Sequence, residues 1–395
     1  MSLLLDLTHT SHTRARTGVQ RVARALRREL GEKADAVCFD PYEGAWRPVE
    51  AWEARNLAAE GPGAGRGARW PLDARFRGRM RRWLGRPSPL PALAPAAGAW
   101  PGGVLVPEIF SPAVASGLPG LFAVSSGPRV AVFHDAIALQ YPEFTARSTA
   151  ARFPGYLRDL LGFDGIAAVS EASRESLIGY WRWLGVSKAP PVAAIPLGLD
   201  PPSPARETRS PAATPTVLCV GSIEGRKNHA ALLDACESLW ARGVKFKLRL
   251  VGIANAETGG PALERLSRLR AAGRPVRYDG PEDDEGLEAA YRECAFTVYP
   301  SLAEGYGLPV AESLARGKPC ICRSSGALGE IALGGGCMGL GAAEPAEIAA
   351  AIGQLIDFPP VLAALEARAR ERRFKTWGDY AAELLSWMGA LEKHA

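Results

Sequence analysis

Short apolar segments alternate along most of the chain with longer segments of helical apolar spacing. We expect a first series of strands at Leu3–Leu7, Val37–Phe39, Val104–Pro107, Val130–Phe133, Ile166–Val169 and Val192–Ile195. A second series is expected at Val217–Val220, Lys247–Val251, Val276–Asp279, Phe296–Tyr299 and Pro319–Cys322. Strands that alternate with helices are typical of parallel sheets covered by helices. The sequence therefore predicts an α/β protein with two such sheets.

Prolines mark the boundary between the two series. Residues 200–215 contain five prolines, each of which lacks an amide proton and fixes φ, so we expect a linker there. The predicted domains are residues 1–204 and 205–375. Helical apolar spacing returns at residues 344–369, and residues 376–395 are expected to form a C-terminal helix that is apolar on one face.

The composition, with 47% apolar and 23% charged residues, is that of a folded chain and not of a disordered one. No run of 18 apolar residues occurs, and the first eight residues are too short and uncharged for a signal peptide, so we expect a soluble, cytoplasmic protein. The seven cysteines include no CxxC pair. We interpret them as reduced core residues, with a metal site at Cys320 and Cys322 as the minor alternative.

Positive charge is concentrated in one segment. Residues 66–86 hold eight arginines and one aspartate, a net charge of +7, within a Pro-, Gly- and Ala-rich insertion at residues 61–101. Its apolar residues recur at helical spacing, which predicts a short basic amphipathic helix. The residues expected to contact an anionic membrane are Phe76, Met80, Arg81, Arg82 and Trp83. Packing on its own domain or binding of an acidic partner are alternatives, and no nucleic-acid motif accompanies the charge.

A loop flanked by glycines follows the strand expected at Phe296–Tyr299. Its sequence, Glu304-Gly-Tyr-Gly-Leu-Pro309, leads into a short helix that contains Glu312. Proline suits the start of a helix, and glycines allow the backbone to approach a ligand. Unpaired amides at a helix start suit a diphosphate. The two carboxylates would then accept hydrogen bonds from the hydroxyls of a sugar nucleotide.

A second segment, Gly221-Ser-Ile-Glu-Gly-Arg226-Lys227, follows the strand expected at Val217–Val220. Open α/β sheets bind ligands at such strand ends. Arg226 and Lys227 would neutralise a diphosphate, and solvated surface charges are the alternative. The segment contains no P-loop motif.

Together these segments resemble the donor-binding half of the retaining family 4 glycosyltransferases of the GT-B fold. Glu304 and Glu312 have the family's spacing of a glutamate, seven residues and a second glutamate. The resemblance extends to Val169-Ser-Glu-Ala-Ser-Arg174 and Ile195-Pro-Leu-Gly-Leu-Asp200, and covers most of the chain. It implies two Rossmann-like domains that face a cleft, with the C-terminal helix crossing back to the first domain.

The resemblance also implies roles for individual residues. Glu312 would hold the ribose, Glu304 the donor hexose, and Arg226 with Lys227 the diphosphate, although many members carry an arginine where this chain has Ser222. Further donor-binding positions are implied at Gly18, Gly221, Gly305, Tyr306, Gly307 and Leu308. The implied catalytic residues are His134, Asp135, Glu304 and Lys227, and a structural role is the alternative for His134 and Asp135.

The implied reaction transfers a hexose from a nucleoside diphosphate sugar to an acceptor hydroxyl, with retention and with neither metal nor cofactor. The segments that begin at Thr17 and His134 look most like those of bacterial mannosyltransferases of O-antigen, capsule and exopolysaccharide pathways, which suggests GDP-mannose and a glycan or lipid-linked acceptor. UDP-glucose, GDP-fucose and dTDP-rhamnose donors stay open, because donor choice changes easily on one scaffold. A sugar-nucleotide 2-epimerase and a non-catalytic membrane-associated scaffold are alternatives of other classes.

Overall fold

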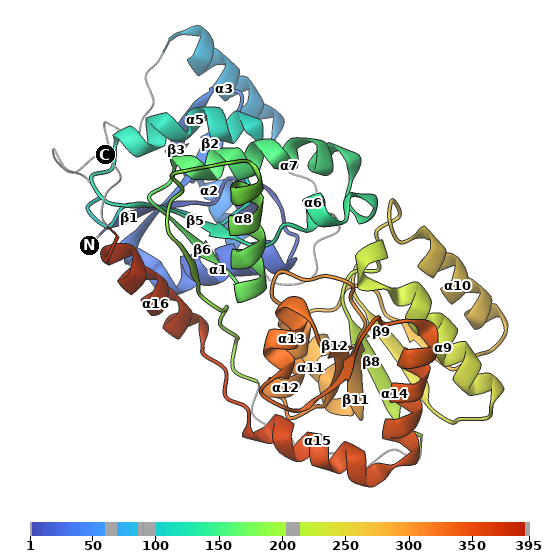
Figure 1. Cartoon of the computed structure of the whole chain (residues 1–395). Coiled ribbons are helices and arrows are strands. Elements are labelled where there is room, and N and C mark those ends of the chain that lie inside the picture. Colours follow the sequence, from blue (N-terminus) through green and yellow to red (C-terminus); the bar gives the residue numbers. More distant parts are fainter. Residues whose placement is uncertain (1, 60–68, 86–89, 91–99, 203–213, 392–395) are drawn as a thin grey trace. The chain divides into compact units, whose positions relative to one another are not determined.

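The computed structural model describes residues 2–59, 69–85, 90, 100–202 and 214–391 (Figure 1). Parts of the expected insertion and linker, including Arg66 and Arg86, lie outside the described residues. The chain forms two compact units. The first unit takes its residues from 1–136, 151–198 and 377–395, and the second from 137–150 and 199–376. The segment 137–150, expected in the first domain, is thus grouped with the second unit.

A seven-stranded sheet forms the centre of the first unit, in the order β3-β2-β1-β4-β5-β6-β7. Its strands are β1 (Leu3–Asp6), β2 (Ala34–Asp40), β3 (Ala45–Pro48), β4 (Val104–Val106), β5 (Arg129–Phe133), β6 (Gly165–Ala168) and β7 (Val192–Ala194). All neighbouring strands are parallel except β3, which pairs antiparallel with β2. The sequence did not predict β3, because a four-residue edge strand after a tight turn has no alternating apolar pattern to reveal it.

Helices cover this sheet. They are α1 (Gly18–Leu30), α2 (Ala51–Ala58), α3 (Leu72–Trp83), α5 (Pro112–Ala123), α7 (Arg147–Asp159), α8 (Glu171–Trp183) and α16 (Trp377–Gly389). The C-terminal helix α16 lies beside α1 in the first unit, although it follows the second unit in sequence (Figure 1). A Cβ at Gly165 would lie 2.8 Å from the Trp387 ring, so the glycine in β6 makes room for this end of the chain. The expected return of the C-terminal helix to the first domain is confirmed.

The second unit contains a fully parallel six-stranded sheet in the order β10-β9-β8-β11-β12-β13. Its strands are β8 (Thr216–Val220), β9 (Lys247–Val251), β10 (Val276–Tyr278), β11 (Phe296–Tyr299), β12 (Cys320–Arg323) and β13 (Cys337–Leu340). Its helices are α6 (Ile137–Gln140), α9 (His229–Ala241), α10 (Gly260–Ala271), α11 (Asp284–Glu293), α12 (Leu308–Ala315), α13 (Gly326–Ala332), α14 (Pro345–Asp357) and α15 (Pro359–Glu371). Both units are therefore Rossmann-like, and the predicted fold class is confirmed.

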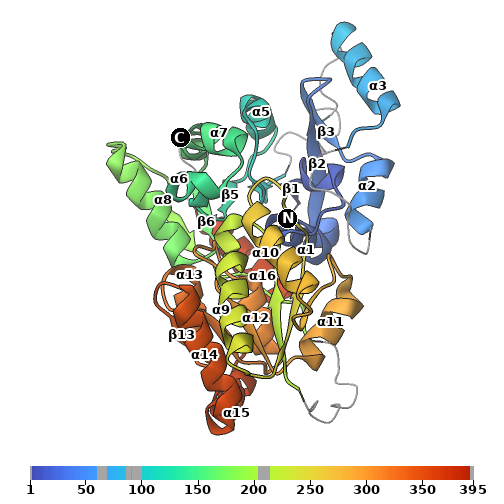
Figure 2. The ribbon, with the colours of Figure 1, turned by 90° about the vertical axis from the view of Figure 1, so that its right-hand side faces the viewer.

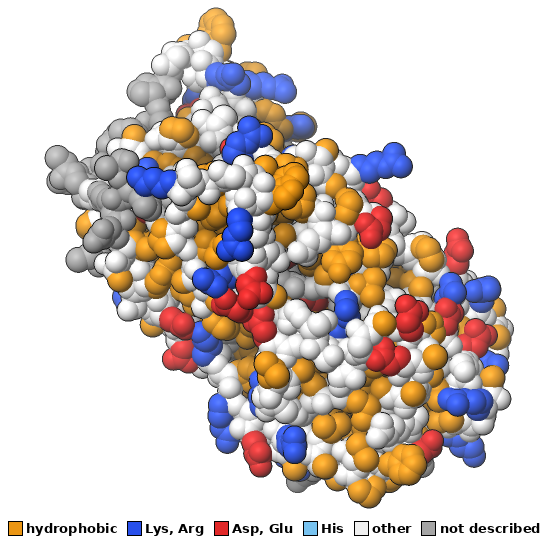
Figure 3. Space-filling model, viewed as in Figure 1, with side chains coloured by type: hydrophobic (Ala, Val, Ile, Leu, Met, Phe, Trp, Pro, Cys, Tyr) orange, Lys and Arg blue, Asp and Glu red, His pale blue; other side chains and the backbone are white. Residues whose placement is uncertain are grey.

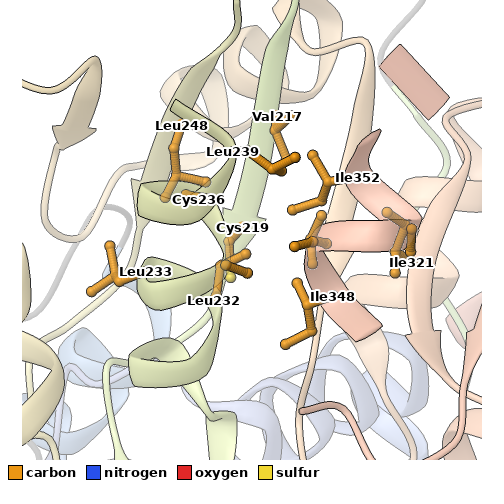
Figure 4. Packing of buried hydrophobic residues seen from close by; sticks show 14 of the residues in the cluster. Val217, Cys219, Leu232, Leu233, Cys236, Leu239, Leu248, Ile321, Ile348 and Ile352 are labelled. Atoms are coloured by element: carbon orange, nitrogen blue, oxygen red, sulfur yellow. The ribbon is translucent and has the colours of Figure 1, made fainter. Parts of the chain in front are cut away.

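Residues 344–369 form two helices, because Pro359 lacks an amide proton and the chain bends by 95° between α14 and α15. In the second unit, aliphatic residues of β8, α9, β12 and α14 pack into one core (Figure 4). All seven cysteines are free thiols, and only Cys337 is not fully buried, as expected for core residues. In the described part of the chain, no single helix is long and apolar enough to cross a membrane; only the bent pair α14 and α15 reaches that length jointly.

Candidate active site

The charged residues predicted from the sequence gather where two neighbouring strands of the second unit end. Strand β8 lies between β9 and β11, so the chain leaves β8 in one direction and returns on its other side. Loops at the carboxyl ends of such strands form the ligand-binding crevice of open α/β sheets. The loop after β8 carries Arg226 and Lys227, and the loop after β11 carries Glu304.

Lys227 is buried at the centre of this cluster, with 8% of its surface exposed. Its Nζ donates a hydrogen bond to Glu304 Oε1 at 2.6 Å and another to the Tyr299 hydroxyl. Burial lowers the pKa of Lys227 below its ordinary value, and the negative charge of Glu304 opposes that shift. The ammonium group is therefore held by one counter-charge and one hydroxyl.

Glu304 accepts every hydrogen bond that it receives from the described residues through one oxygen. Its Oε1 accepts from Lys227, from the Tyr299 hydroxyl at 3.0 Å and from the Ser301 hydroxyl, and lies 2.8 Å from an Arg226 nitrogen. Burial alone would raise the pKa of Glu304, but the charges of Arg226 and Lys227 lower it to about 2. The group is thus a carboxylate whose Oε2 makes no contact among the described residues.

Arg226 is the second cation of the cluster. Besides its pair with Glu304, it donates to the carbonyl oxygen of Ala303 at 3.1 Å and pairs with Glu224 at 2.9 Å. The structure therefore brings together Arg226, Lys227 and Glu304. Sequence analysis missed Tyr299 and Ser301, whose hydroxyls join this cluster.

The loop between β11 and α12 contains two glycines just before the helix begins. Gly307 has φ of +106°, and a Cβ there would lie 2.6 Å from Leu328 Cδ2, so no other residue fits without rearrangement. The first turn of α12 follows at Leu308 and Pro309. Pro309 has no amide proton, and the Val310 amide donates to the Gly307 carbonyl oxygen at 3.0 Å, so among these three residues only the Leu308 amide is left for a ligand. Gly305 and Gly307 are buried, and Tyr306, whose pKa burial raises to about 12, is half-buried beside them. The donor-binding role expected for these loop residues stays a prediction.

Glu312 lies inside α12 and is buried, with 4% of its surface exposed. The hydroxyl of Tyr291, on α11, donates a hydrogen bond to Glu312 Oε2 at 3.2 Å. The Arg316 guanidinium lies 4.7 Å from the centre of the Tyr291 ring and donates to the backbone oxygen of Glu312. Tyr291 and Arg316 hold Glu312 in place, and sequence analysis missed both, since a tyrosine in a helix has the pattern of a core residue.

The remaining predicted residues belong to the first unit. His134 follows β5, is buried, and its Nε2 lies 2.8 Å from the carbonyl oxygen of Pro107. Because a carbonyl only accepts, Nε2 carries the proton and Nδ1 of the neutral ring is an acceptor. Burial lowers the pKa of His134, against the opposing charge of Asp135. Gly18 begins α1, and a Cβ there would meet no atom within 4 Å.

Two buried carboxyl groups near the start of α1 were not predicted. Glu108, which follows β4, accepts hydrogen bonds from the backbone amides of His9 and Thr10 at 2.8 and 2.9 Å. Asp6, at the end of β1, accepts from the Thr8 amide. Burial and the charge of Asp6 raise the pKa of Glu108 to about 8, and burial raises that of Asp6 to about 6. The pair fixes the loop that leads into α1.

A group with metal-ligating side chains also lies in the first unit. Ligand atoms of His12, Cys38 and Glu53 all lie within 4.8 Å of one another. Arg47, however, donates to both Glu53 oxygens at 2.8 and 2.9 Å, and His12 donates to the same carboxylate. A carboxylate already neutralised by a guanidinium is a poor ligand for a cation, so we interpret the group as a buried ion-pair network.

The two Rossmann-like units have the GT-B fold, which the chain shares with the solved structures described below. Residues 214–357 match the family described as glycosyl transferases group 1. This match covers less than half of the chain and lies within the second unit. Among solved structures, Anabaena HepE in complex with UDP and glucose has a TM-score of 0.70 and 17% identity over 99% of this chain and all of HepE. Sucrose-phosphate synthase from Thermosynechococcus elongatus has a TM-score of 0.67 and 20% identity over 98% of both chains.

Several curated relatives are named as mannosyltransferases, and others as D-inositol 3-phosphate glycosyltransferases. The serotype-specific mannosyltransferase WbdA of Escherichia coli is 28% identical over 84% of this chain and 40% of its own length. The O-antigen chain mannosyltransferase B of Escherichia coli is 28% identical over 51% of this chain and 54% of its own. A GDP-mannose-dependent phosphatidylinositol dimannoside mannosyltransferase of Mycobacterium tuberculosis is 27% identical over 66% and 68%. The chain thus spans about 40% of the length of WbdA.

Proposed function

We propose that this chain transfers mannose from GDP-mannose to a hydroxyl group of a glycan or lipid-linked acceptor in the synthesis of a bacterial cell-surface polysaccharide. The group 1 domain supports sugar transfer, and the names of three relatives support mannose. One of these relatives is named as GDP-mannose-dependent, which supports the nucleotide. The proposed transfer retains the anomeric configuration and uses no metal.

The observation that carries the proposal is the asymmetry of Glu304. Four donors of the protein fix its Oε1, and its Oε2 has no partner among the described residues. A carboxylate at pKa about 2 accepts hydrogen bonds throughout the physiological pH range. We assign Oε2 to a hydroxyl of the donor hexose, and Glu312 to the ribose.

The cations beside Glu304 supply the electrostatic part of the reaction. When the bond between the anomeric carbon and the phosphate oxygen breaks, negative charge grows on the leaving diphosphate. Lys227, Arg226 and the Leu308 amide at the start of α12 stabilise that charge. The acceptor attacks on the same face, and its proton passes to an oxygen of the leaving diphosphate, so the step needs no protein base at the attacking oxygen. His134, a neutral ring with Nδ1 as acceptor, and Asp135 are assigned to contacts with the sugar.

A thermal-shift series tests the donor. GDP, UDP, ADP and dTDP, with their common sugar conjugates, are added to the full chain, since a ligand at 100 times its Kd adds about 2.7 kcal/mol of stability. We expect GDP and GDP-mannose to raise the Tm of the wild type and of the exposed control Glu285→Ala, and not that of Glu312→Ala. A shift with UDP or dTDP and not with GDP would reassign the donor.

Product analysis tests the reaction class. With GDP-mannose and a mannose-containing acceptor, we expect a new α-linkage by NMR, in buffer with or without a chelator. Consumption of the donor to an epimer without acceptor would point to a 2-epimerase. Binding without any turnover would point to a scaffold, and loss of turnover in the chelator would overturn metal independence.

A further inference from the structure

Helix α3 packs on the first unit through its small residues. Ala74 and Gly78 are its buried positions, and a Cβ at Gly78 would lie 2.9 Å from Tyr42 Cβ and 3.2 Å from the Glu43 amide nitrogen. Arg75 donates to the Tyr42 hydroxyl at 2.8 Å, and Arg81 pairs with Glu43 at 3.4 Å. The side of the helix with the small residues thus packs on the turn between β2 and β3, near which α3 lies in Figure 2.

The opposite side of α3 presents its large apolar residues to solvent. Leu72, Phe76 and Trp83 are 78%, 64% and 84% exposed, and Met80 and Leu84 are 43% and 50% exposed. At 100° per residue these five positions form one stripe, directed away from Ala74 and Gly78. A surface helix of a soluble protein normally buries its large apolar residues, so this orientation is inverted. Exposed apolar patches of this kind mark interaction surfaces.

Arginines border the apolar stripe. Arg79 and Arg82 are exposed, and within the described residues neither has a carboxylate within ion-pair distance. The Arg79 guanidinium lies 5.5 Å from the centre of the Tyr42 ring, and a Cβ at Gly44 would lie 4.0 Å from the Arg82 guanidinium carbon. Arg77, on the other border, pairs with Asp73 and Glu50. Hydrophobic and basic side chains lie next to one another over α3 in the space-filling view (Figure 3). The charged side chains of this surface that have no ion-pair partner among the described residues are therefore the two arginines Arg79 and Arg82.

We propose that the outward side of α3 docks on an anionic lipid bilayer, with Phe76, Met80 and Trp83 in the headgroup region and Arg79 and Arg82 against lipid phosphates. A single convex helix with aromatic residues on one side and arginines beside them matches a membrane interface. Arg81, expected from the sequence to take part, differs: its pair with Glu43 holds it on the packing side. This surface belongs to the first unit, and the residues assigned to the nucleotide, Arg226, Lys227 and Glu312, belong to the second, so membrane binding and GDP binding are measured separately.

Vesicle flotation of the full chain tests the proposal. Vesicles of phosphatidylcholine with or without phosphatidylglycerol are mixed with the wild type, with Phe76→Ser/Trp83→Ser, and with Arg79→Glu/Arg82→Glu. The matched control is Trp183→Ser/Leu184→Ser, which removes side chains that are 79% and 45% exposed on α8 of the same unit. Each variant is also checked for its Tm and for its response to GDP, which reports folding and donor binding independently of the membrane.

We expect the wild type and the control to float with anionic vesicles and not with neutral ones. The arginine variant should lose at least about tenfold in vesicle affinity, as removal of two membrane-proximal cations predicts. The aromatic variant should lose binding at an unchanged Tm. Absence of wild-type flotation, or equal flotation of the aromatic variant, would overturn the proposal. A dimer that the aromatic variant dissociates, without vesicle binding, would assign the stripe to a second copy instead.

Discussion

Glu304 in the second unit and Glu108 in the first occupy similar places, each in the loop that follows a central strand, and each is shielded from water. The pKa values of the two carboxyl groups are shifted from the ordinary value of a glutamate in opposite directions. Arg226 and Lys227 lower the pKa of Glu304 to about 2, whereas burial beside Asp6 raises that of Glu108 to about 8. Burial raises both values; the sign of the net shift follows from the charge of the nearest neighbours.

This difference separates a binding carboxylate from a structural one. Glu304 keeps its negative charge because two cations surround it, and the same cations suit a diphosphate. Glu304 is thus the internal counter-ion of the cluster, and we propose that a donor diphosphate takes over the two cations when it binds. Glu108 accepts hydrogen bonds from the backbone amides of His9 and Thr10. It fixes a loop, and we assign it no contact with substrate.

The largest effect is expected from Lys227→Met, which removes the buried cation and makes the surroundings of Glu304 more like those of Glu108. Growing charge on the leaving phosphate then loses a donor, and kcat should fall by about 10²- to 10³-fold, by analogy with loss of an oxyanion-hole donor. Steady-state assays at saturating donor measure the effect. The control is Lys247→Met, an exposed lysine on β9. A fall no larger than that of the control would remove Lys227 from the mechanism.

Glu304→Gln keeps the shape of the side chain and removes its charge. Hydrogen bonds to charged groups contribute about 1.5–3 kcal/mol, so weakening the contact with the hexose should lower kcat by about 10- to 100-fold. Release of Arg226 and Lys227 from their counter-ion should leave GDP affinity unchanged or higher. Calorimetric titration with GDP, together with kinetics, measures both. Glu312→Ala serves as the contrast, because it should weaken GDP binding more than turnover. A fall in GDP affinity in Glu304→Gln would contradict the counter-ion role.

Most of the fold was predictable, because buried parallel strands are apolar along their whole length. The strands β3 and β13 were missed, since each lies at a sheet edge and is short or rich in glycine and polar residues. Such edge strands form because they pair with a neighbouring strand, and this pairing cannot be read from the residue pattern of the segment itself. The orientation of α3 was also not predictable. The spacing of its apolar residues shows that they share one side of the helix. It does not show whether that side or the opposite side, with its small residues, packs against the protein.

Sequence analysis identified the charged residues of the candidate site but not the residues that hold them by hydrogen bonds. Motif spacing identifies Lys227 and Glu304, whereas Tyr299 and Ser301 join them only because the topology places β11 next to β8. Tyr291 reaches Glu312 because α11 lies close to α12. Glu108 was missed for a different reason: a single glutamate after a strand has no partner in its own segment, and its contacts are about a hundred residues away.

Glu108→Gln replaces the structural carboxyl with a neutral amide of the same shape. A carboxyl whose pKa is raised on folding stabilises the folded state at low pH, and this contribution is lost as the pH rises through about 6 for Asp6 and about 8 for Glu108. The Tm of the variant relative to wild type should therefore increase between about pH 4.5 and 8 and then stay constant, by about 2–4 °C for each kcal/mol. Scanning calorimetry measures it, with the exposed Glu32→Gln as control. A constant difference across that range would show that Glu108 is already ionised.

The carboxylate of Glu312 accepts a hydrogen bond from a phenol hydroxyl, that of Tyr291, whereas Glu304 is paired with two cations. Tyr291→Phe removes that hydrogen bond, which is worth about 0.5–1.5 kcal/mol, so GDP affinity should fall about two- to tenfold with kcat unchanged. Tyr278→Phe is the matched control, because its hydroxyl bonds the Gly252 carbonyl at 2.9 Å in the same unit. Calorimetric titration and Tm are measured on both variants. If Tyr291→Phe lowers only the Tm, the hydroxyl stabilises the packing of α11 on α12. If it lowers affinity at an unchanged Tm, it positions the carboxylate that we assign to the ribose.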